Sequence, residues 1–562
     1  MVNLESRKLG DFLGAAVGLF ILINVNLVFS KLNPSIDLTG DKRYTLSGPV
    51  IQLLKDLDDV VYIDVYLRGD FPPGFERLEN STIDILNEFK SVAGSNIQFD
   101  FIDPEYFRGT SGLKDIAEYL GGLGIQPTNL YASEKGKRTE KLIFPGAVIS
   151  FGGRESGVML LKGNKSASPQ EQLNQSIEGL EYEFATAISK LVDIEKRQIG
   201  LIRGHGELEM DLMESAVSML NENFEVFPVN LPARPTLIGF DVVIMAKPSR
   251  TIPEQDIYKI DQYIMNGGKV IFMIDALHID EDSIGNGGTI AYPFSSNLDN
   301  LLFKYGARVN KDLVLDLNAG VFPVVTGNLG NSPNFQLLPW PYFPVLNHFG
   351  EHPIVHNIDA VYTRYISSID TVEASGVTKI PLIYSSPYTR KIPSPVRVSL
   401  NDLKAEMDPK IFNQGQVMVS CLLEGNFSSV FKNRYLPDGV DEENFRDNGV
   451  PAKIIILSDG DFPRNFKNSS TGADYELGYD PWLKKTFANK DFILNAVSYL
   501  SDDQGIIVSR SRQVTFRPLD NVKIGKEKTL WQAINILLPV MMVILFGYSR
   551  HLVRKRKFNK PS

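Results

Sequence analysis

Two long apolar runs without a charged residue stand near the two ends of the chain. Residues 12–29 read FLGAAVGLFILINVNLVF, and residues 530–548 read LWQAINILLPVMMVILFGY. At about 1.5 Å per residue, each run would form roughly 27 Å of helix, close to the hydrocarbon thickness of a bilayer. We therefore expect a transmembrane helix at each end. A cleaved signal peptide is the weaker interpretation of the first run, because such peptides have apolar cores of about 7–15 residues followed by small residues.

The flanks of the second run predict its orientation. Trp531 and Tyr548 stand at its ends, where amphipathic rings favour the headgroup region of a membrane. Two spans place residues 1–11 and 549–562 on one side, and the positive-inside rule makes that side the cytoplasm. Roughly residues 30–529 are then expected on the exported side of the membrane. The residues expected to set this topology are Arg550, Arg554, Lys555, Arg556 and Lys557.

Polar residues inside the apolar runs bear on the partners of the two spans. Asn24 and Asn26 lie in the first run, and Gln532, Asn535 and Pro539 lie in the second. Their polar groups would be better satisfied against other membrane helices than against lipid. Amides near a helix end also reach the interface by themselves, and this interpretation is equally consistent with the pattern.

Apolar and polar positions alternate between strand and helix periods across residues 44–193. The predicted order is β-α-β-α-β-β-α, which is that of a thioredoxin-like α/β domain. No Cys-x-x-Cys occurs in the chain, so the redox chemistry of that fold is excluded. The expected strands are 60–66, 97–102, 141–144 and 158–161, with a turn at Gly152-Gly153, and the expected helices are 75–93, 113–120 and 170–192.

A second α/β unit is predicted over residues 196–505. Strands alternate with helices there, which is typical of a parallel, doubly wound sheet of flavodoxin or amidotransferase type. The expected strands are 198–202, 240–245, 269–274, 416–423 and 453–457, and the expected helices are 207–223, 257–265 and 492–500.

The second unit contains a long insertion at about residues 278–415. Within it, residues 338–345 read LPWPYFPV, which cannot form a regular helix, and we expect a rigid surface loop or lid there. Residues 506–529 are predicted to form a last strand and a linker that lead to the membrane.

Composition and charge exclude several classes of protein. Cys421 is the single cysteine, so an intramolecular disulfide and a cysteine-based zinc cluster are both excluded. The formal charge is −9 although the last thirteen residues hold six basic side chains and no acidic one. The rest of the chain is therefore strongly acidic, and we expect no binding to nucleic acid, because phosphates require clustered Lys and Arg.

Candidate chemistry lies where predicted parallel strands end. His205 and Glu207 follow the strand at 198–202, Asp275 follows the strand at 269–274, and Asp459 and Asp461 follow the strand at 453–457. Ligands of open parallel sheets bind beyond these strand ends. These five residues are therefore candidate contacts for a metal, a polar ligand or a partner. The favoured interpretation is that they act as helix caps and turn formers.

Other chemical motifs are weak or missing. His348, His352 and His356 recur at every fourth residue, but Gly350 and Pro353 interrupt any helix that would align them. Cys421 lacks the glycines of a nucleophile elbow and is predicted to be a core residue. No G-x-x-x-x-G-K-[ST] occurs, so the chain is not a P-loop ATPase. We expect no catalytic site, no cofactor and no bound metal.

A set of short segments occurs in a fixed order along the chain. They are RYTLS at 43–47, FIDP at 101–104, GHGE at 204–207, HPI at 352–354, LLEGNF at 422–427 with Ser428, Phe431 and Arg434, SDGDF at 458–462, NKDFILN at 489–495, and the closing apolar run. In this order they resemble the GldG family of auxiliary components of gliding-motility-associated ABC transporters, over nearly the whole chain. The central α/β unit of that family is similar to a non-catalytic domain of an intraflagellar transport subunit and of certain glycosidases.

The resemblance implies a subunit that lies beside a separate permease and a separate cytoplasmic ATPase, without catalytic residues of its own. Three functions remain open. The first is a non-enzymatic transporter subunit that acts in gliding motility or envelope transport and engages a substrate or an envelope protein. The second is a structural envelope protein. The third, which is less favoured, is a periplasmic hydrolase that uses the crevice around His205, Glu207, Asp275 and Asp459.

Overall fold

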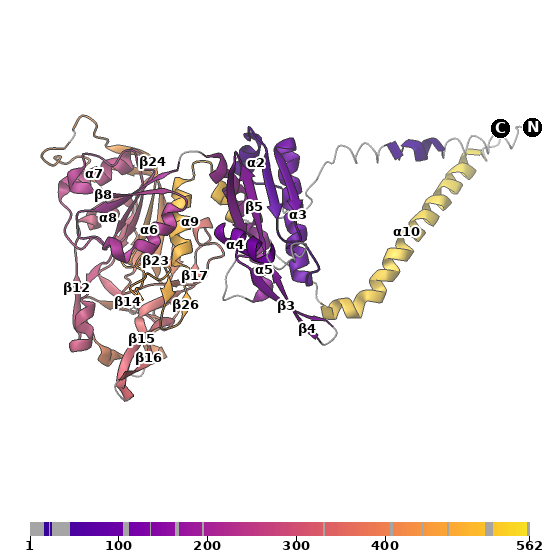
Figure 1. Cartoon of the computed structure of the whole chain (residues 1–562). Helices are drawn as coiled ribbons and strands as arrows, with labels where there is room; N and C mark the ends of the chain where they lie inside the picture. Colours follow the sequence, from indigo (N-terminus) through magenta and orange to yellow (C-terminus); the bar gives the residue numbers. More distant parts are fainter. Residues whose placement is uncertain are drawn as a thin grey trace, which may run out of the picture. The chain divides into compact units, whose positions relative to one another are not determined.

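The computed structural model divides into two units, residues 1–512 and residues 513–562, which we describe separately (Figure 1). The chain is a mixed α/β protein. The residues that the structure describes are 16–21, 23–24, 45–104, 112–134, 137–162, 168–193, 196–329, 332–404, 408–440, 442–468, 471–511 and 521–558.

A four-stranded sheet forms the first α/β domain. Its strand order is β2-β1-β5-β6, in which β1 and β2 are parallel and the other neighbours are antiparallel. The strands are β1 (Val61–Val65), β2 (Ile97–Phe101), β5 (Gly146–Phe151) and β6 (Arg154–Met159).

Helices cover both faces of this sheet. On one face, α3 (Pro73–Ala93) and α5 (Pro169–Val192) bury Phe89 and Phe184, whose ring centroids lie 6.4 Å apart. Ser168 caps α5 by accepting the Glu171 N–H. On the other face lies α4 (Gly112–Gly122). The strand expected at 141–144 overlaps the end of β4 (Lys137–Ile143), which forms a hairpin with β3 (Thr128–Glu134) that the sequence pattern did not reveal. The turn expected at Gly152-Gly153 joins β5 to β6 instead.

An eight-stranded sheet forms the second domain, with the order β17-β20-β23-β24-β10-β9-β7-β8. The five strands from β24 to β8 are parallel. Numbered 1 to 5 in chain order and read from β8 to β24, they have the order 2-1-3-4-5, which is the flavodoxin-like order. Three antiparallel strands extend this sheet at one edge. The strands are β7 (Gln198–Arg203), β8 (Glu225–Asn230), β9 (Val242–Ala246), β10 (Lys269–Met273), β17 (His348–Phe349), β20 (Val377–Tyr384), β23 (Met418–Ser428) and β24 (Asn448–Leu457).

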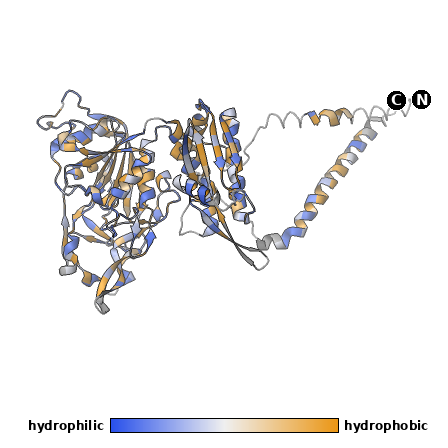
Figure 2. Ribbon diagram, in the orientation of Figure 1, coloured by the Kyte–Doolittle hydropathy of each residue, from blue (hydrophilic) through white to orange (hydrophobic). Residues whose placement is uncertain are grey.

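Side chains alternate between two cores on either side of this sheet. Ile199 and Ile244 face the core beneath the helices α6 (Glu214–Asn221) and α9 (Asn489–Ser501). Val243 and Met245 face the core beneath α7 (Glu254–Met265) and α8 (Leu298–Tyr305). Figure 2 shows these strands as hydrophobic segments between helices with polar outer surfaces. The doubly wound arrangement follows from this alternation.

The helix that was expected at 207–223 begins later, at Glu214. Leu208 is buried, and its N–H donates to the Ala246 carbonyl, so this segment crosses the sheet edge before α6 begins. The prediction also missed β8, which contains Pro228 and lies at the edge of the sheet, where proline is tolerated.

The aromatic-proline segment 338–345 is not a surface loop or lid. It lies in β16 (Ser332–Leu346), which pairs antiparallel with β15 (Ala319–Leu329), and its Trp340, Tyr342 and Phe343 are buried. Proline prevents a helix, but it is compatible with a strand that is not paired along both sides. The remaining inserted strands include β11 (Leu277–His278), β12 (Thr289–Pro293), β14 (Asp312–Asp316), β18 (Val361–Tyr362), β21 (Thr389–Pro393) and β22 (Val396–Val398).

The last strand expected from residue 506 onward is also wrong over the described residues. Ile506–Ser511 form a 3₁₀ helix, η9, and residues 512–520 lie outside the described part. The Asp502 carboxylate accepts the N–H groups of Gln504, Gly505 and Ile507, which closes a tight turn instead of a strand. Ile506 and Ile507 join the core of the first domain.

One helix of the described part is long and apolar enough to cross a membrane. It is the segment Gly525–Val553 of α10 (Asn521–Phe558), which is longer than the predicted span and buries none of its apolar window. Figure 2 shows this helix as hydrophobic over most of its length. In the first apolar run, residues 16–21, 23 and 24 are helical, and the rest of that run, like residues 1–11, lies outside the described residues.

Candidate functional site

The parallel strands bring the sequence-predicted residues to one edge of the second sheet. Met273 of β10 is in register with Ala246 of β9 and with Leu457 of β24, so the segments after these strands lie side by side. Lys247 follows β9 directly and lies between the acidic segments. The strand order reverses between β7 and β9, which is where ligands of such sheets bind.

Lys247 joins two of the candidate carboxylates. Its Nζ contacts Asp461 directly and lies 3.4 Å from Oδ2 of Asp275. Burial alone would lower the pKa of Lys247, but the charges of Asp275 and Asp461 raise it well above its ordinary value. Burial would likewise raise the pKa of Asp461, but Lys247 holds it below its ordinary value. Lys247 and Asp461 therefore form an ion pair in which the carboxylate is buried and the lysine is partly exposed.

The other oxygens of these carboxylates are also engaged. The Gly460 N–H donates to Oδ1 of Asp275 at 2.6 Å, and Arg464 Nη1 lies 3.3 Å from Oδ1 of Asp461. Gly460 approaches so closely that a Cβ there would lie 2.8 Å from Cβ of Lys247. The segment after β24 is thus held in place by contacts to Lys247, which follows β9, and to Asp275, which follows β10.

Asp459 is buried and connects this edge to the inserted segment. Its Oδ2 accepts the Arg364 N–H at 2.9 Å, and its Oδ1 accepts the Asp461 N–H at 2.9 Å. Burial, followed by the charges of Asp275 and Asp461, raises the pKa of Asp459 well above its ordinary value. Its role in the structure is therefore to hold the inserted segment at the ends of the strands.

His205 forms a second, separate group with Glu207 and Asp256. Nδ1 lies 3.2 Å from Oε1 of Glu207, and Nε2 lies 2.9 Å from Oδ2 of Asp256 in the first turn of α7. Burial would lower the pKa of His205, but the hydrogen bonds to the two carboxylates raise it. Burial would raise the pKa of Glu207, but His205 lowers it. The imidazole therefore joins the segment after β7 to α7.

The sequence-predicted residues thus fall into two internally bonded groups. A general base needs a free lone pair that faces a substrate, whereas the carboxylates and the imidazole here contact the chain itself. Within the described residues, no group of three or more His, Cys, Asp or Glu is placed to hold a metal ion. Sequence reasoning missed Lys247, Asp256 and Arg364, because their partners lie far away along the chain.

The three regularly spaced histidines do not share a helix. His348 lies in β17, whereas His352 and His356 flank the 3₁₀ turn Pro353–Val355. His352 Nδ1 accepts the Ile354 N–H, and burial lowers the pKa of His352 to about 4. Cys421 is fully buried in β23, and burial raises the pKa of its thiol to about 12. A nucleophilic role for this thiol is therefore disfavoured.

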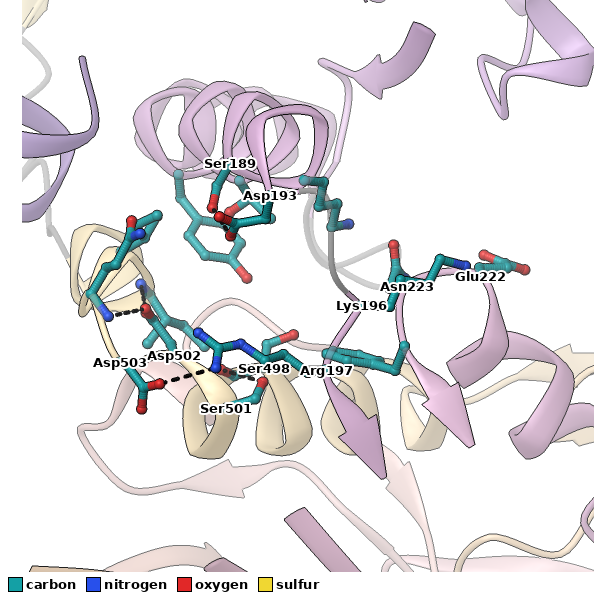
Figure 3. Close-up of a pocket in the computed structure, with 17 residues that line it drawn as sticks. Ser189, Asp193, Lys196, Arg197, Glu222, Asn223, Ser498, Ser501, Asp502 and Asp503 are labelled. Atoms are coloured by element: carbon teal, nitrogen blue, oxygen red, sulfur yellow. Dashed lines mark hydrogen bonds and ion pairs between the residues drawn. The ribbon is translucent and has the colours of Figure 1, made fainter. Parts of the chain in front are cut away.

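A cavity of about 210 Å³ lies at the other end of the second sheet, between the end of α5 and the end of α9 (Figure 3). Ser189 and Asp193 face Ser501 and Asp502 across it. Arg197 Nη1 lies 3.2 Å from Asp503 Oδ2 and 3.3 Å from Asp241 Oδ1. The charge of Arg197 is thus balanced by aspartates of the same chain. The sequence contains no motif that predicts this cavity.

Comparison with known proteins assigns the second domain. The family model described as an ABC-type uncharacterized transport system, the auxiliary component of such systems, matches residues 196–496. That match spans more than half of the chain. The chain belongs to this auxiliary ABC transport family. The matched region contains the whole flavodoxin-like sheet and both bonded groups at its edge. A second model, described as a domain of unknown function, DUF7088, matches residues 40–150 of this family member.

Individual relatives of this auxiliary protein add little about its activity. An uncharacterized protein of Borreliella burgdorferi is 23% identical, with all of both chains covered. The mmIFT52 N-terminal domain is 12% identical, with a TM-score of 0.30 and coverage of 54% of this chain and 98% of that one. A thua-like protein from Parabacteroides merdae is 11% identical, with a TM-score of 0.27 and coverage of 58% and 93%. Both TM-scores are low, so the family match alone carries information on function.

Proposed function

We propose that this chain is a non-enzymatic auxiliary subunit of an ABC transporter complex. In this proposal α10 anchors it in the membrane and packs on a separate permease, which couples it to a cytoplasmic ATPase. The observation that carries the proposal is the apolar segment Gly525–Val553, which buries none of its surface within the chain. A helix that is apolar on all sides requires lipid or other membrane helices around it.

One face of α10 is suited to a helix partner. Gln532, Asn535 and Pro539 recur at spacings of three and four residues, which places them on the same face. Amide side chains within a membrane hydrogen-bond across helices, and proline leaves a backbone carbonyl of its own helix without a donor. A permease helix that supplies polar groups at this face would satisfy both, whereas lipid would satisfy neither.

The strand-edge groups support a role without catalysis. The cations Lys247 and Arg464 neutralise Asp461, and His205 is held between two carboxylates. In this proposal His205, Glu207, Asp275, Asp459 and Asp461 maintain the shape of the exported domain instead of performing hydrolysis.

The cellular setting belongs to the same proposal. Both termini lie in the cytoplasm, the bulk of the chain lies in the periplasm, and the complex resides in the inner membrane. The motifs shared with GldG proteins favour a role in gliding motility or envelope transport, in which the exported domains engage a substrate or an envelope protein. Trp531 and Tyr548 anchor the span at the interfaces, and the basic tail residues set its orientation.

The proposal is tested by affinity purification of the tagged, full-length protein in mild detergent, followed by mass spectrometry. We expect a multi-span permease and a P-loop ATPase to co-purify with it. The variant Gln532→Leu/Asn535→Leu should lose both proteins. The control Leu537→Val/Ile544→Val changes the opposite face of α10 and should retain them. Recovery of neither protein with the wild-type chain, in a preparation that remains folded, would contradict the proposal.

A further inference from the structure

An aromatic cavity of about 220 Å³ lies beside the strand-end edge, outside the two bonded groups. Its walls come from four places in the chain: the start of the inserted segment, the hairpin β15–β16, the segment at and after β18, and the segment after β24. The aromatic residues that matter for its chemistry are Phe322, Phe343, Phe466 and Trp482. Trp482 is 41% exposed, so it stands at the rim.

Arg364 forms the polar floor of this cavity. Its guanidinium lies 4.7 Å from the ring centre of Phe466 and 5.0 Å from that of Phe343. The side chain is 13% exposed, and its ion pair with Glu281 spans 3.7 Å, beyond hydrogen-bonding distance. Among the described residues, no hydrogen bond satisfies the guanidinium N–H groups. The guanidinium N–H groups are therefore available to a molecule in the cavity.

Glu281 supplies an acceptor at the same place. Its Oε1 is buried and has no hydrogen-bond partner among the described residues, while its Oε2 lies 3.6 Å from Nη1 of Arg464. The cavity therefore presents unsatisfied donors from Arg364 and an unsatisfied acceptor from Glu281, next to each other.

The two opposite charges limit the class of ligand. The charges of Arg364 and Glu281 nearly cancel, so the site offers no net attraction to a cation or to an anion. A neutral molecule with several hydroxyl groups would accept from Arg364 and donate to Glu281. The aromatic walls need an apolar ring face to pack against. A saccharide ring combines both properties, because its C–H face is apolar and its edge carries hydroxyl groups.

The size of the cavity agrees with one ring. A cavity of about 150 Å³ is enough for benzene, so about 220 Å³ leaves room for a six-membered ring with its hydroxyl groups. Beyond the rim, the ring centres of Trp482 and the exposed Phe335 lie 5.7 Å apart. This aromatic pair extends the apolar surface from the cavity to solvent, which suits further units of a chain.

We propose that the cavity bounded by Arg364, Glu281, Phe322 and Trp482 binds one ring of a neutral glycan. The aromatic walls receive the ring face, and the Arg364–Glu281 pair receives its hydroxyl groups. The proposal does not depend on association with a transporter, because every side chain of the site belongs to the α/β domain.

The test is isothermal titration calorimetry on the full-length protein in a detergent without a sugar headgroup. The probes are four trisaccharides: maltotriose and triacetylchitotriose as neutral sugars, trigalacturonate as an acidic one, and triglucosamine as a basic one. We expect saturable binding of at least one neutral sugar, with a Kd of about 1 mM for a single stacked ring. The charged sugars should bind at least about tenfold more weakly.

Three variants test whether the neutral sugar binds in this cavity and whether the charge of Glu281 is needed. Trp482→Ala should weaken binding of the neutral sugar about tenfold, because the exposed ring contributes stacking and little to the core. Tyr435→Ala removes another exposed aromatic ring, far along the chain, and should leave binding unchanged. Glu281→Gln keeps an acceptor and should retain neutral-sugar binding within about threefold.

Two results would overturn the proposal. One is the lack of saturable binding of both neutral sugars up to about 10 mM, ten times the expected Kd. The other is tighter binding of trigalacturonate than of the neutral sugars, with a further gain in Glu281→Gln, which would assign the cavity to anions. Neither result would bear on the association with a permease, which the purification experiment measures separately.

Discussion

The hydroxyl of Tyr305 in α8 donates a 2.7 Å hydrogen bond to Oδ1 of Asp261 in α7, and both side chains are fully buried. The same carboxylate accepts the Ser429 hydroxyl at 2.7 Å and the Val430 N–H at 2.9 Å. One carboxylate thus joins two helices to the segment after β23. The hydrogen bond to Asp261 gives a role to Ser429, which follows the LLEGNFS segment. Phe427 and Phe431, on either side of Ser429, belong to the core.

Replacing Asp261 by alanine should destabilise the second domain by about 3 kcal/mol, because several buried donors lose their acceptor at once. Tyr305→Phe removes one of these bonds and should cost about 1 kcal/mol. Urea denaturation followed by tryptophan fluorescence measures both values. Glu254→Ala, an exposed position in the first turn of the same helix, should change stability by less than about 0.5 kcal/mol. Equal losses in the Asp261 and Glu254 variants would argue against this role.

The pair of His205 with Asp256 predicts a pH dependence of stability. The pKa of His205 is raised above its ordinary 6.5, so its contribution is complete below pH 6.5 and is lost as the pH rises through the higher folded-state pKa. The pKa of Glu207 is lowered below its ordinary 4.5, so its contribution is complete above pH 4.5 and is lost on acidification through the lower folded-state pKa. Both contributions are complete between pH 4.5 and 6.5.

His205→Gln should therefore cost about 1–3 kcal/mol at pH 6 and clearly less at pH 9. The measurement is the free energy of unfolding in urea at both pH values. His278→Gln tests the same substitution at an exposed histidine of β11 and should have little effect at either pH. A loss for His205→Gln that is the same at pH 6 and pH 9 would show that the imidazole contributes packing and not charge.

Lys247 and Asp461 should behave as a coupled pair. Lys247→Met should destabilise the protein by about 2 kcal/mol, because Asp461 is buried and keeps only Arg464 as a cation. Asp461→Asn should cost less, about 1 kcal/mol, because the Lys247 side chain is 32% exposed and keeps Asp275 as a partner. The double variant should cost less than the sum of the two, and the difference is the coupling free energy. A cycle on the exposed pair Arg308 and Asp370, which lie 2.7 Å apart, should give a coupling below about 1 kcal/mol. Additive effects at Lys247 and Asp461 would contradict the ion pair.

Cys421 should resist alkylation while the protein is folded. Its side chain is fully buried, so a reagent does not reach the sulfur. The pKa of its thiol is raised to about 12, so little of the reactive thiolate forms at neutral pH. We expect maleimide to label it in urea but not in buffer, as measured by intact mass. Tyr435→Cys introduces a thiol at a fully exposed position and should be labelled in buffer. Rapid labelling of Cys421 in the native protein would contradict the core assignment.

Local patterns were sufficient to predict most of the parallel sheet. The apolar runs of β7, β9, β10 and β24 are buried on both faces, so each of them is a nearly continuous apolar segment in the sequence. Their alternation with helices predicts that they are parallel, but it does not predict their order in the sheet. The mixed α/β class was therefore predictable, and the structure confirms it.

Other features depend on contacts between distant residues, which one sequence does not reveal. Lys247 and Asp461 are separated by 214 positions, so the aspartates were recognisable as candidates while the lysine that neutralises them was not. Asn489 holds the insertion by accepting the Tyr362 N–H and donating to its carbonyl, across 127 positions. The prolines of residues 338–345 exclude a regular helix and therefore favour a loop, and only the pairing with β15 makes that segment a strand.

The position of β24 in the sheet has a consequence for how the protein is made. β10 ends at Met273, and its parallel neighbour β24 begins only at Asn448. At about 5–20 residues per second, the ribosome needs roughly 10–40 s to complete β24 after β10 has emerged. During that interval one edge of β10 stays open to pairing with other chains. Aggregation through this open edge is therefore the main hazard for the incomplete chain until β24 arrives.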